Sequence, residues 1–284
     1  MKVAITGSTG LIGNYLSRGL RSRDWEVFAI GCNDLAGDVQ ALSRKLSGMD
    51  MLINLAGAPI MHRWSKAYKD VMYNSRVEGT RNLVKAMGLS ESPPPLLISA
   101  SAVGIYQDGG PHTETNAVYT NSFLGNLTQQ WEKAALQNSA DTRVAVLRFG
   151  VVLAADGGAL AKQLPLFRLG LGGMIGNGLQ PFPWIHIEDI LQIILFIQSN
   201  QVLNGVFNAV APEQINNKEF TGKLAKILNK PAIFTVPGFA LKVLFGEGAS
   251  ALTSGQAVIP ERLLKLGFQF RFQDLDVALK DLIK

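Results

Sequence analysis

The chain of 284 residues is long enough to bury a large apolar core, and it suits one large α/β unit or a larger domain joined to a smaller one. Its formal net charge of +5 is spread over scattered lysines and arginines, which disfavours a nucleic-acid-binding role. The single cysteine, Cys32, excludes an internal disulfide bond, and no Cys/His cluster has the spacing of a metal site. No apolar stretch is long enough to span a bilayer. We therefore expect a cytoplasmic protein whose partner is neither nucleic acid nor a membrane.

Short apolar runs alternate with helical patterns through the first half of the chain. This alternation predicts an α/β fold, built on a Rossmann-type, doubly wound parallel sheet. The predicted strands lie near residues 2–6, 26–30, 51–55, 96–100 and 143–148.

A glycine-rich turn joins the first strand to the first helix. Gly7 permits a tight turn, Gly10 lets the backbone approach a phosphate, and Gly13 allows close packing of the helix. The helix that follows would present unpaired N–H groups and the positive end of its dipole, which is where a dinucleotide pyrophosphate binds. The cofactor contacts predicted from this turn are Gly7, Ser8, Thr9, Gly10, Leu11, Ile12 and Gly13.

The lengths of two later segments also predict secondary structure. Between Ile30 and Met51 there is room for one helix, but hardly for a helix, a strand and a second helix. The outer strand beside the second strand is therefore predicted to be missing. A helical region runs from about 65 to 88, and the three prolines at 93–95 end it before a strand begins at Leu96.

The ends of the next two strands carry small and polar residues, at the sheet edge where ligands of open α/β sheets bind. Ser101 is predicted to hydrogen-bond a substrate hydroxyl or carbonyl, the alternative being a helix or turn cap. The other residues predicted to contact the cofactor here are Leu55, Ala56, Gly57, Ser99 and Ala100.

The pattern changes after Val152. Residues 154–183 hold many glycines and few charges, and helices are predicted near 189–199, 217–228 and 238–246. We therefore divide the chain into a dinucleotide-binding domain, 1–152, and a smaller C-terminal α/β substrate-side domain, 153–284. A strand at 206–209 is predicted to return to the first sheet.

Several motifs together resemble an extended short-chain dehydrogenase/reductase. They are TGSTGLIG at 6, NLAG at 54, NSRVEGT at 74, SASAVGIY at 99, WE at 131, RFGVVL at 148 and WIHIED at 184. Further segments narrow the resemblance to the YfcH-like epimerase family, an NAD-dependent epimerase/dehydratase-like group with a C-terminal domain of unknown function, here 236–284. These segments are GGAL at 157, GNGLQ at 176, VPGF at 236, PERL at 260 and GFQF at 267.

The resemblance implies a catalytic pair that this sequence lacks. In active members a tyrosine four residues before a lysine performs the acid/base chemistry, and the lysine lowers the pKa of the tyrosine and holds the nicotinamide ribose. No tyrosine here has a lysine four residues later, and the segment 123–128 reads Phe-Leu-Gly-Asn-Leu-Thr. Tyr106 and His186 are the candidate replacements. Their structural alternatives are a packed tyrosine ring and a strand that leads into a helix capped by Asp189.

The residues predicted to meet the substrate follow the fifth strand and the glycine-rich region. Arg148 would contact an anionic substrate or pair with a carboxylate, and both interpretations stand. Trp131 is expected in the core. The predicted substrate contacts are Arg148, Gly150, Trp184 and His186.

The second strand ends with Gly31 where an NAD site usually carries Asp or Glu, and Asp34 comes about three residues late. The missing carboxylate and the family resemblance favour NADP, with NAD as the alternative. Cys32 and Asn33 are the predicted contacts at this end of the site.

Two functions follow from these features. The first is an NADP-dependent oxidoreductase or sugar-nucleotide-epimerase-like enzyme that acts on a small molecule, with self-association as a homodimer left open. The second is a regulator or sensor that keeps the NAD(P) site and has lost the chemistry, which the apolar segment 123–127 would explain.

Overall fold

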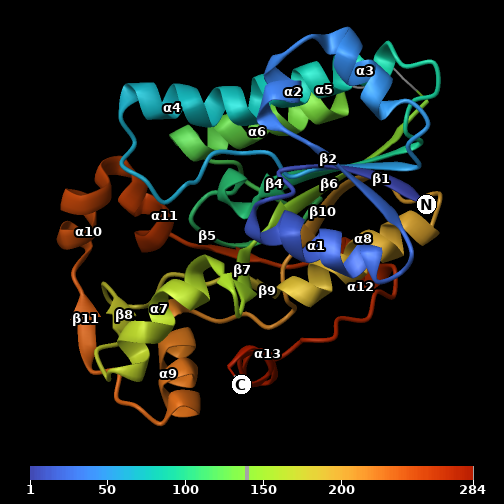
Figure 1. Ribbon diagram of the computed structural model, residues 1–284. Coiled ribbons are helices and arrows are strands. Elements are labelled where there is room, and N and C mark those ends of the chain that lie inside the picture. Colours follow the sequence, from blue (N-terminus) through green and yellow to red (C-terminus); the bar gives the residue numbers. More distant parts are fainter. Residues whose placement is uncertain (138–140, 284) are drawn as a thin grey trace.

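The computed structural model describes residues 1–137 and 141–283. Its centre is a parallel sheet whose six strands, among the described residues, lie in the order β10-β6-β4-β3-β1-β2 (Figure 1). The register sets Thr6 beside Asn54 and Asn54 beside Ser99, so the carboxyl ends of β1, β3 and β4 meet at one edge. The strands are β1 (Lys2–Thr6), β2 (Glu26–Ile30), β3 (Met51–Asn54), β4 (Leu96–Ala102), β6 (Arg143–Phe149) and β10 (Gly205–Ala209).

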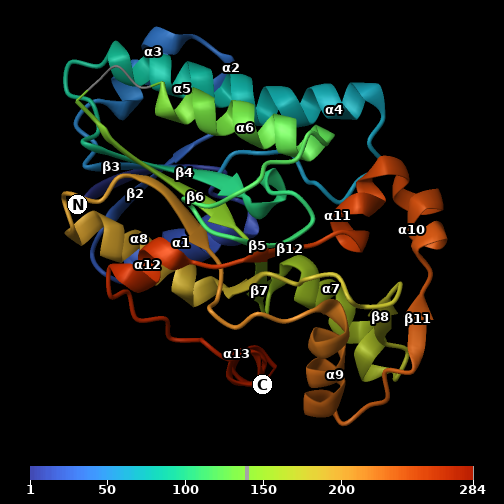
Figure 2. The ribbon, with the colours of Figure 1, turned by 180° about the vertical axis from the view of Figure 1, so that it is seen from behind.

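Helices cover both faces of this sheet (Figures 1 and 2). Because side chains alternate along a strand, Val3 and Ile5 of β1 face one helical layer and Ala4 faces the other. The first layer consists of α1 (Leu11–Arg21) and α8 (Ile187–Ser199). The second consists of α2 (Cys32–Ala36), α3 (Val39–Leu46), α4 (Lys66–Tyr73), α5 (Gly79–Gly88) and α6 (Phe123–Leu136).

The predicted helical region at 65–88 is helical throughout but not uniform. A π-helical turn, Asn74–Glu78, joins α4 to α5. Such turns widen the helix locally and are often found at functional sites. Here the turn carries Arg76, which is buried.

A smaller lobe gathers at one end of the molecule, at the lower left in Figure 1. Its two-stranded sheets pair β7 (Val151–Ala154) with β9 (Trp184–His186), and β8 (Gly173–Ile175) with β11 (Phe234–Val236). A third pair, β12 (Gln256–Val258) with β5 (Gly109–His112), links the C-terminal segment to the loop after β4. The remaining elements are α7 (Gly158–Arg168), α9 (Asn217–Leu228), α10 (Gly238–Phe245), α11 (Ser250–Thr253), α12 (Glu261–Lys265), α13 (Leu275–Leu282) and the 3-10 turns Val103–Ile105 and Gly246–Ala249.

The predicted fold class and the five strands of the first half are confirmed, and residues 206–209 return to the sheet within β10. Within the described residues β2 is an edge strand, as the short interval after Ile30 predicted. That interval holds two short helices, α2 and α3, where one was expected, because Gly37 and Asp38 end one helix and begin the next. No helix in the described ranges is long and apolar enough to cross a membrane.

Candidate functional site

The glycine turn after β1 has the geometry that its three glycines require. Gly7 has φ +66°, which residues with a Cβ rarely adopt, and Gly10 N donates to Gly7 O at 3.0 Å. A Cβ at Gly13 would lie 2.2 Å from Gly7 O, so only glycine lets α1 approach the turn this closely. A Cβ at Gly10 would make one close contact, with Gly7 O at 3.3 Å, so Gly10 is far less crowded than Gly13.

The N-terminus of α1 fits a phosphate. No side chain caps it, and its first turn contains no acidic residue that would compete with an anion. The first-turn N–H groups and the helix dipole therefore remain available for a negatively charged group next to Gly10. The residues present fit a dinucleotide pyrophosphate at this place.

The end of β2 bears on the choice of dinucleotide. Gly31 precedes α2, and the Asp34 carboxylate accepts a hydrogen bond from Gly31 N at 2.9 Å and from Lys45 Nζ. The hydrogen bond from Lys45 lowers the pKa of Asp34. Cys32 and Asn33 are exposed at the start of α2. The nearest acidic group is thus engaged with its own helix and a lysine.

A chain of hydroxyl and amide groups ties the neighbouring strand ends together. Thr6 Oγ1 donates to Asn54 Oδ1 at 2.7 Å and accepts from the backbone N of Leu55 and Ala56. Asn54 Nδ2 donates to Ser99 Oγ and Thr80 Oγ1. Ser99 is fully buried, so its hydroxyl serves the packing of β3 on β4.

Ser101, at the end of β4, belongs to a buried polar network. Its hydroxyl donates to Glu132 Oε1 of α6 at 2.5 Å, and Glu132 forms a bidentate ion pair with Arg148 of β6, each bond 2.7 Å long. Arg148 also donates to the hydroxyl groups of Tyr106 and Tyr119. Of the two interpretations of Arg148, the structure shows the pairing with a carboxylate.

Tyr106 lies inside this network and is fully buried. Its hydroxyl donates to Asn208 Oδ1 and accepts from Arg148, each at 2.7 Å. Burial raises the pKa of Tyr106 to about 12, with Arg148 acting in the opposite direction. A catalytic tyrosine needs a lowered pKa and access to substrate, so this geometry favours a positioning role for Tyr106.

Arg76 lies against the loop that follows β3, a placement that was not predicted from the sequence. Its side chain is 8% exposed, and its guanidinium lies on Gly57, where a Cβ would come within 2.9 Å of Cζ. The absence of a side chain at Gly57 thus leaves room for the guanidinium of Arg76. A signal was present, because Arg76 falls on the buried stripe of Met72, Thr80 and Leu83 at helical spacing.

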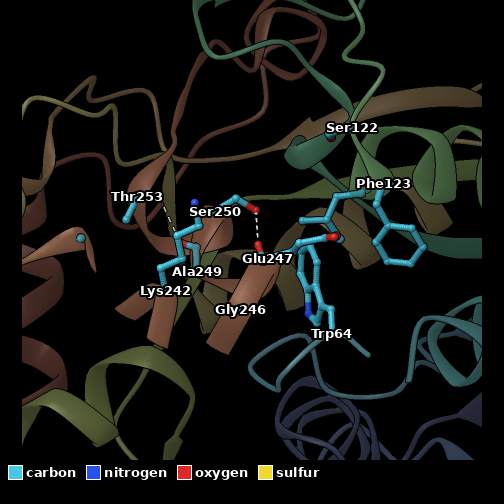
Figure 3. Close-up of a pocket in the computed structure, with 11 residues that line it drawn as sticks. Trp64, Ser122, Phe123, Lys242, Gly246, Glu247, Ala249, Ser250 and Thr253 are labelled. Carbon is cyan, nitrogen blue, oxygen red and sulfur yellow. Dashed lines mark hydrogen bonds between the residues drawn. The ribbon is translucent and has the colours of Figure 1, made fainter. Parts of the chain in front are cut away.

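A cavity of about 510 Å³ lies between the N-terminus of α6 and the C-terminal helices (Figure 3). Trp64 and Phe123 form one side of it, and Lys242, Ala249 and Thr253 lie opposite (Figure 3). The other lining residues are Ser122, Leu124, Gly238, Gly246, Glu247 and Ser250. The apolar segment found in place of the tyrosine and lysine thus forms part of the cavity wall.

The four residues predicted to contact substrate lie elsewhere. Arg148 is enclosed by the network, and Gly150 packs so closely that a Cβ would lie 2.6 Å from Pro183 O. Trp184 is fully buried in the apolar core of the smaller lobe. His186 lines a second cavity of about 180 Å³ together with Leu11 and Tyr15.

The predicted cap at Asp189 is wrong: His186 Nδ1 caps α8, and the Asp189 carboxylate accepts instead from the backbone N of Arg271 and Phe272. Trp131, by contrast, is in the core as expected, with its Nε1 donating to Thr80 Oγ1.

Comparison with known proteins assigns the chain to a family. Residues 3–209 match the NAD dependent epimerase/dehydratase family. The chain belongs to this family. Residues 236–282 match a domain of unknown function, DUF1731, which confirms the narrower resemblance to epimerases with this C-terminal segment.

Relatives of the family match along the whole chain. The mouse protein named Epimerase family protein SDR39U1 is 37% identical over 292 residues, covering 100% of both chains. Its Arabidopsis thaliana chloroplastic homologue is 36% identical over 303 residues, covering 100% of this chain and 87% of that protein. The crystal structure of human SDR39U1 with NADPH has a TM-score of 0.92 at 35% identity and covers 99% of both chains.

The two matched regions meet at the large cavity. Trp64, Phe123 and Leu124 come from the epimerase region, and Lys242 and Thr253 come from the DUF1731 region. The C-terminal domain of this family member therefore supplies one wall of a cavity whose other wall belongs to the epimerase fold.

Proposed function

We propose that this protein is an NADP(H)-dependent oxidoreductase or epimerase of the extended short-chain dehydrogenase/reductase type. The observation that carries the proposal is the turn at Gly7, Gly10 and Gly13, with its uncapped helix N-terminus, in a chain that matches a structure containing NADPH over 99% of its length. The cofactor contacts would be the residues of this turn, the loop from Leu55 to Gly57 and the start of α2.

The end of β2 supports NADP over NAD. A ribose with a free 2′-hydroxyl is normally held by a carboxylate at the end of this strand, whereas a 2′-phosphate needs that carboxylate absent and a cation nearby. Gly31 offers no carboxylate. The carboxylate of Asp34 is already bonded to Gly31 N and to Lys45, and Lys45 is the cation near this end of the site.

The cavity of about 510 Å³ is our proposed substrate site. Its size is in the range of small-molecule pockets, and aromatic rings form much of one side. Within the described residues its two charged groups are Lys242 and Glu247, and Glu247 is paired with Lys69. One uncompensated cation suits one anionic group, whereas a diphosphate would need more. We therefore propose a compact, largely apolar alcohol or carbonyl compound as the substrate, in place of a sugar nucleotide.

Ser101 is 2% exposed and lies outside the lining of this cavity, and it is our candidate for the group that orients the reacting hydroxyl. Because its single O–H donates to Glu132, its oxygen can only accept a hydrogen bond from a ligand. A substrate hydroxyl that donates to Ser101 would thus be linked through it to the Glu132 carboxylate. When bound, the nicotinamide would supply the chemistry of hydride transfer. Tyr106 and Arg148 would hold Glu132 and Ser101 in place.

The alternative function is a nucleotide-binding sensor without turnover. One observation favours it: Phe123 and Leu124 carry no titratable group at the cavity wall, and the nearest acid/base candidates are already bonded to protein groups. Under this hypothesis the protein binds the cofactor, and the cavity binds a ligand without converting it.

Calorimetric titration with NADPH, NADP⁺, NADH and NAD⁺ tests both functions, followed by a panel of apolar aldehydes, ketones, alcohols and sugar nucleotides monitored at the nicotinamide absorbance. We expect NADPH to bind more tightly than NADH. The variant Gly10→Asp requires a shift of only a few tenths of an ångström, because its Cβ would lie 3.3 Å from Gly7 O, and it should lose binding through repulsion of the phosphates. Absence of binding for all four dinucleotides would refute both functions, and binding without turnover across the panel would favour the sensor.

A further inference from the structure

Arg76 is a buried cation without a buried anion. Its side chain is 8% exposed, and no carboxylate within the described residues lies within 4.0 Å of it. Its hydrogen bonds go to two backbone carbonyl groups, Ala58 O at 2.8 Å and Met72 O at 3.5 Å. The guanidinium also lies 5.4 Å from the ring of Trp131.

Arg148 shows how the same protein compensates the charge of another buried arginine. Arg148 has a bidentate carboxylate partner, Glu132, as buried charges normally do. Burial lowers the pKa of Arg76 to about 10, and the Tyr68 phenol, not a carboxylate, opposes this shift. The desolvation of Arg76 is therefore offset by two carbonyl groups and an aromatic face, and more N–H donors remain than these contacts use.

The position of Arg76 follows from the order of the strands. The pyrophosphate site lies at the end of β1, and the adenine half of a dinucleotide lies toward the end of β2. The nicotinamide half must then extend over β3 and β4, on the other side of β1. Arg76 contacts Gly57 and Ala58, just beyond β3, and Trp131 of α6, which covers β4.

The π-helical turn sets the direction of this side chain. Ser75 in the same turn accepts a hydrogen bond from Ala58 N at 3.0 Å, while Arg76 donates to Ala58 O. Both backbone groups of Ala58 are thus held by adjacent residues of the turn. This fixes Arg76 at the sheet edge.

We propose that Arg76 is a cofactor-binding residue that faces the nicotinamide-ribose half of the dinucleotide and supplies the positive charge which the absent lysine would have supplied. The inference rests on the proposed function. It predicts that the site favours the neutral, reduced nicotinamide over the positively charged, oxidised one, because a cation close to the ring repels the oxidised form.

The test measures Kd by calorimetry for NADPH, NADP⁺ and 2′,5′-ADP, the last being a fragment without nicotinamide. In the native protein we expect the ratio of Kd for NADP⁺ to Kd for NADPH to exceed one. Arg76→Met should reduce that ratio about fivefold or more, and Arg76→Lys should retain most of it. Binding of 2′,5′-ADP should stay unchanged in both variants.

Arg81→Met is the matched control, because Arg81 lies on α5 just after the π-helical turn, is exposed, and pairs with Glu78. It should leave all three constants unchanged. Thermal unfolding without ligand identifies any variant that fails to fold, in which case Arg76→Lys and Arg76→Gln decide. An equal rise in Kd for NADPH and NADP⁺ would place Arg76 on the pyrophosphate and overturn the proposal, as would unchanged constants. A native protein that binds neither NADPH nor 2′,5′-ADP would instead refute the proposed function itself.

Discussion

At the scale of single residues, packing and function are separable within the glycine turn. Gly13 is required by the approach of α1 to the turn, whereas a Cβ at Gly10 would make only one close contact, at 3.3 Å. We predict that Gly13→Ala lowers the free energy of unfolding by roughly 2–3 kcal/mol, because its Cβ would lie 2.2 Å from a backbone oxygen. Urea denaturation measures this change. The control is Gly222→Ala in α9, where a Cβ meets nothing within 4 Å, and equal stability of the two variants would contradict the prediction.

The ion pair between Glu132 and Arg148 gives a second prediction at this scale. Removing one partner leaves a buried charge unpaired, so Glu132→Ala should lower the free energy of unfolding by about 3–5 kcal/mol. Adding Arg148→Met should restore part of the loss, since no charge then remains uncompensated. Lys265→Met, in an exposed ion pair, should change stability little. If the double variant were less stable than Glu132→Ala, the pair would not be the source of the effect.

The glycine turn could be predicted from sequence because its requirements are local: a left-handed φ and a close helix approach both select glycine within seven residues. The network around Ser101 could not, because Glu132 lies 31 residues away and Asn208 lies 102 residues from Tyr106. The local sequence makes Ser101 and Tyr106 candidate site residues, but their hydrogen-bond partners depend on how distant strands meet. Lys242 of the cavity wall gave no local signal of any kind.

At the scale of elements, the junction of β9 and α8 contains two titratable side chains, His186 and Asp189, whose effects on the free energy of unfolding have opposite signs as the pH falls. Burial lowers the pKa of His186 to about 4, and burial raises the pKa of Asp189 to about 6. As pH falls below 6.5, the unfolded chain protonates His186 and the folded protein does not, which costs stability. Over pH 6 to 4 the folded protein protonates Asp189 before the unfolded chain does, which restores stability.

We predict that Asp189→Asn removes this compensation. Between pH 6.5 and 4 the variant should lose about 3 kcal/mol more stability than the native protein, the value expected for about two pKa units. Urea denaturation at several pH values measures the difference. Glu188, Arg271 and Asp281 also face His186 and are present in both proteins, so their effects on the pKa of His186 cancel in the comparison. Parallel pH profiles would contradict the prediction, and Asp156→Asn, on the exposed surface, is the control.

At the scale of the whole molecule, the division at residue 152 does not coincide with the packing. Ile190, Ile193 and Ile197 of α8 lie in the core beneath β1, and β10 completes the central sheet beside β6. Leu263 and Phe268, close to the C-terminus, join the same core. Sequence periodicity predicted the helix near 189–199 and the return of 206–209 to the sheet. It could not show that α8 and the segment around Leu263 and Phe268 join the same core.

We therefore predict that the fragment 1–152 does not fold on its own, although it contains the whole glycine turn. It would expose the face of the sheet that α8 covers and the edge of β6 that β10 pairs with, and so lose the apolar burial that stabilises the fold. The fragment should show no cooperative thermal transition by circular dichroism and no binding of NADPH, whereas a fragment of residues 1–235 retains β10 and α8 and should show more residual structure. The full chain is the control. A sharp transition with dispersed amide resonances for residues 1–152 would show instead that the nucleotide-binding half is an independent domain and that the C-terminal half only docks onto it.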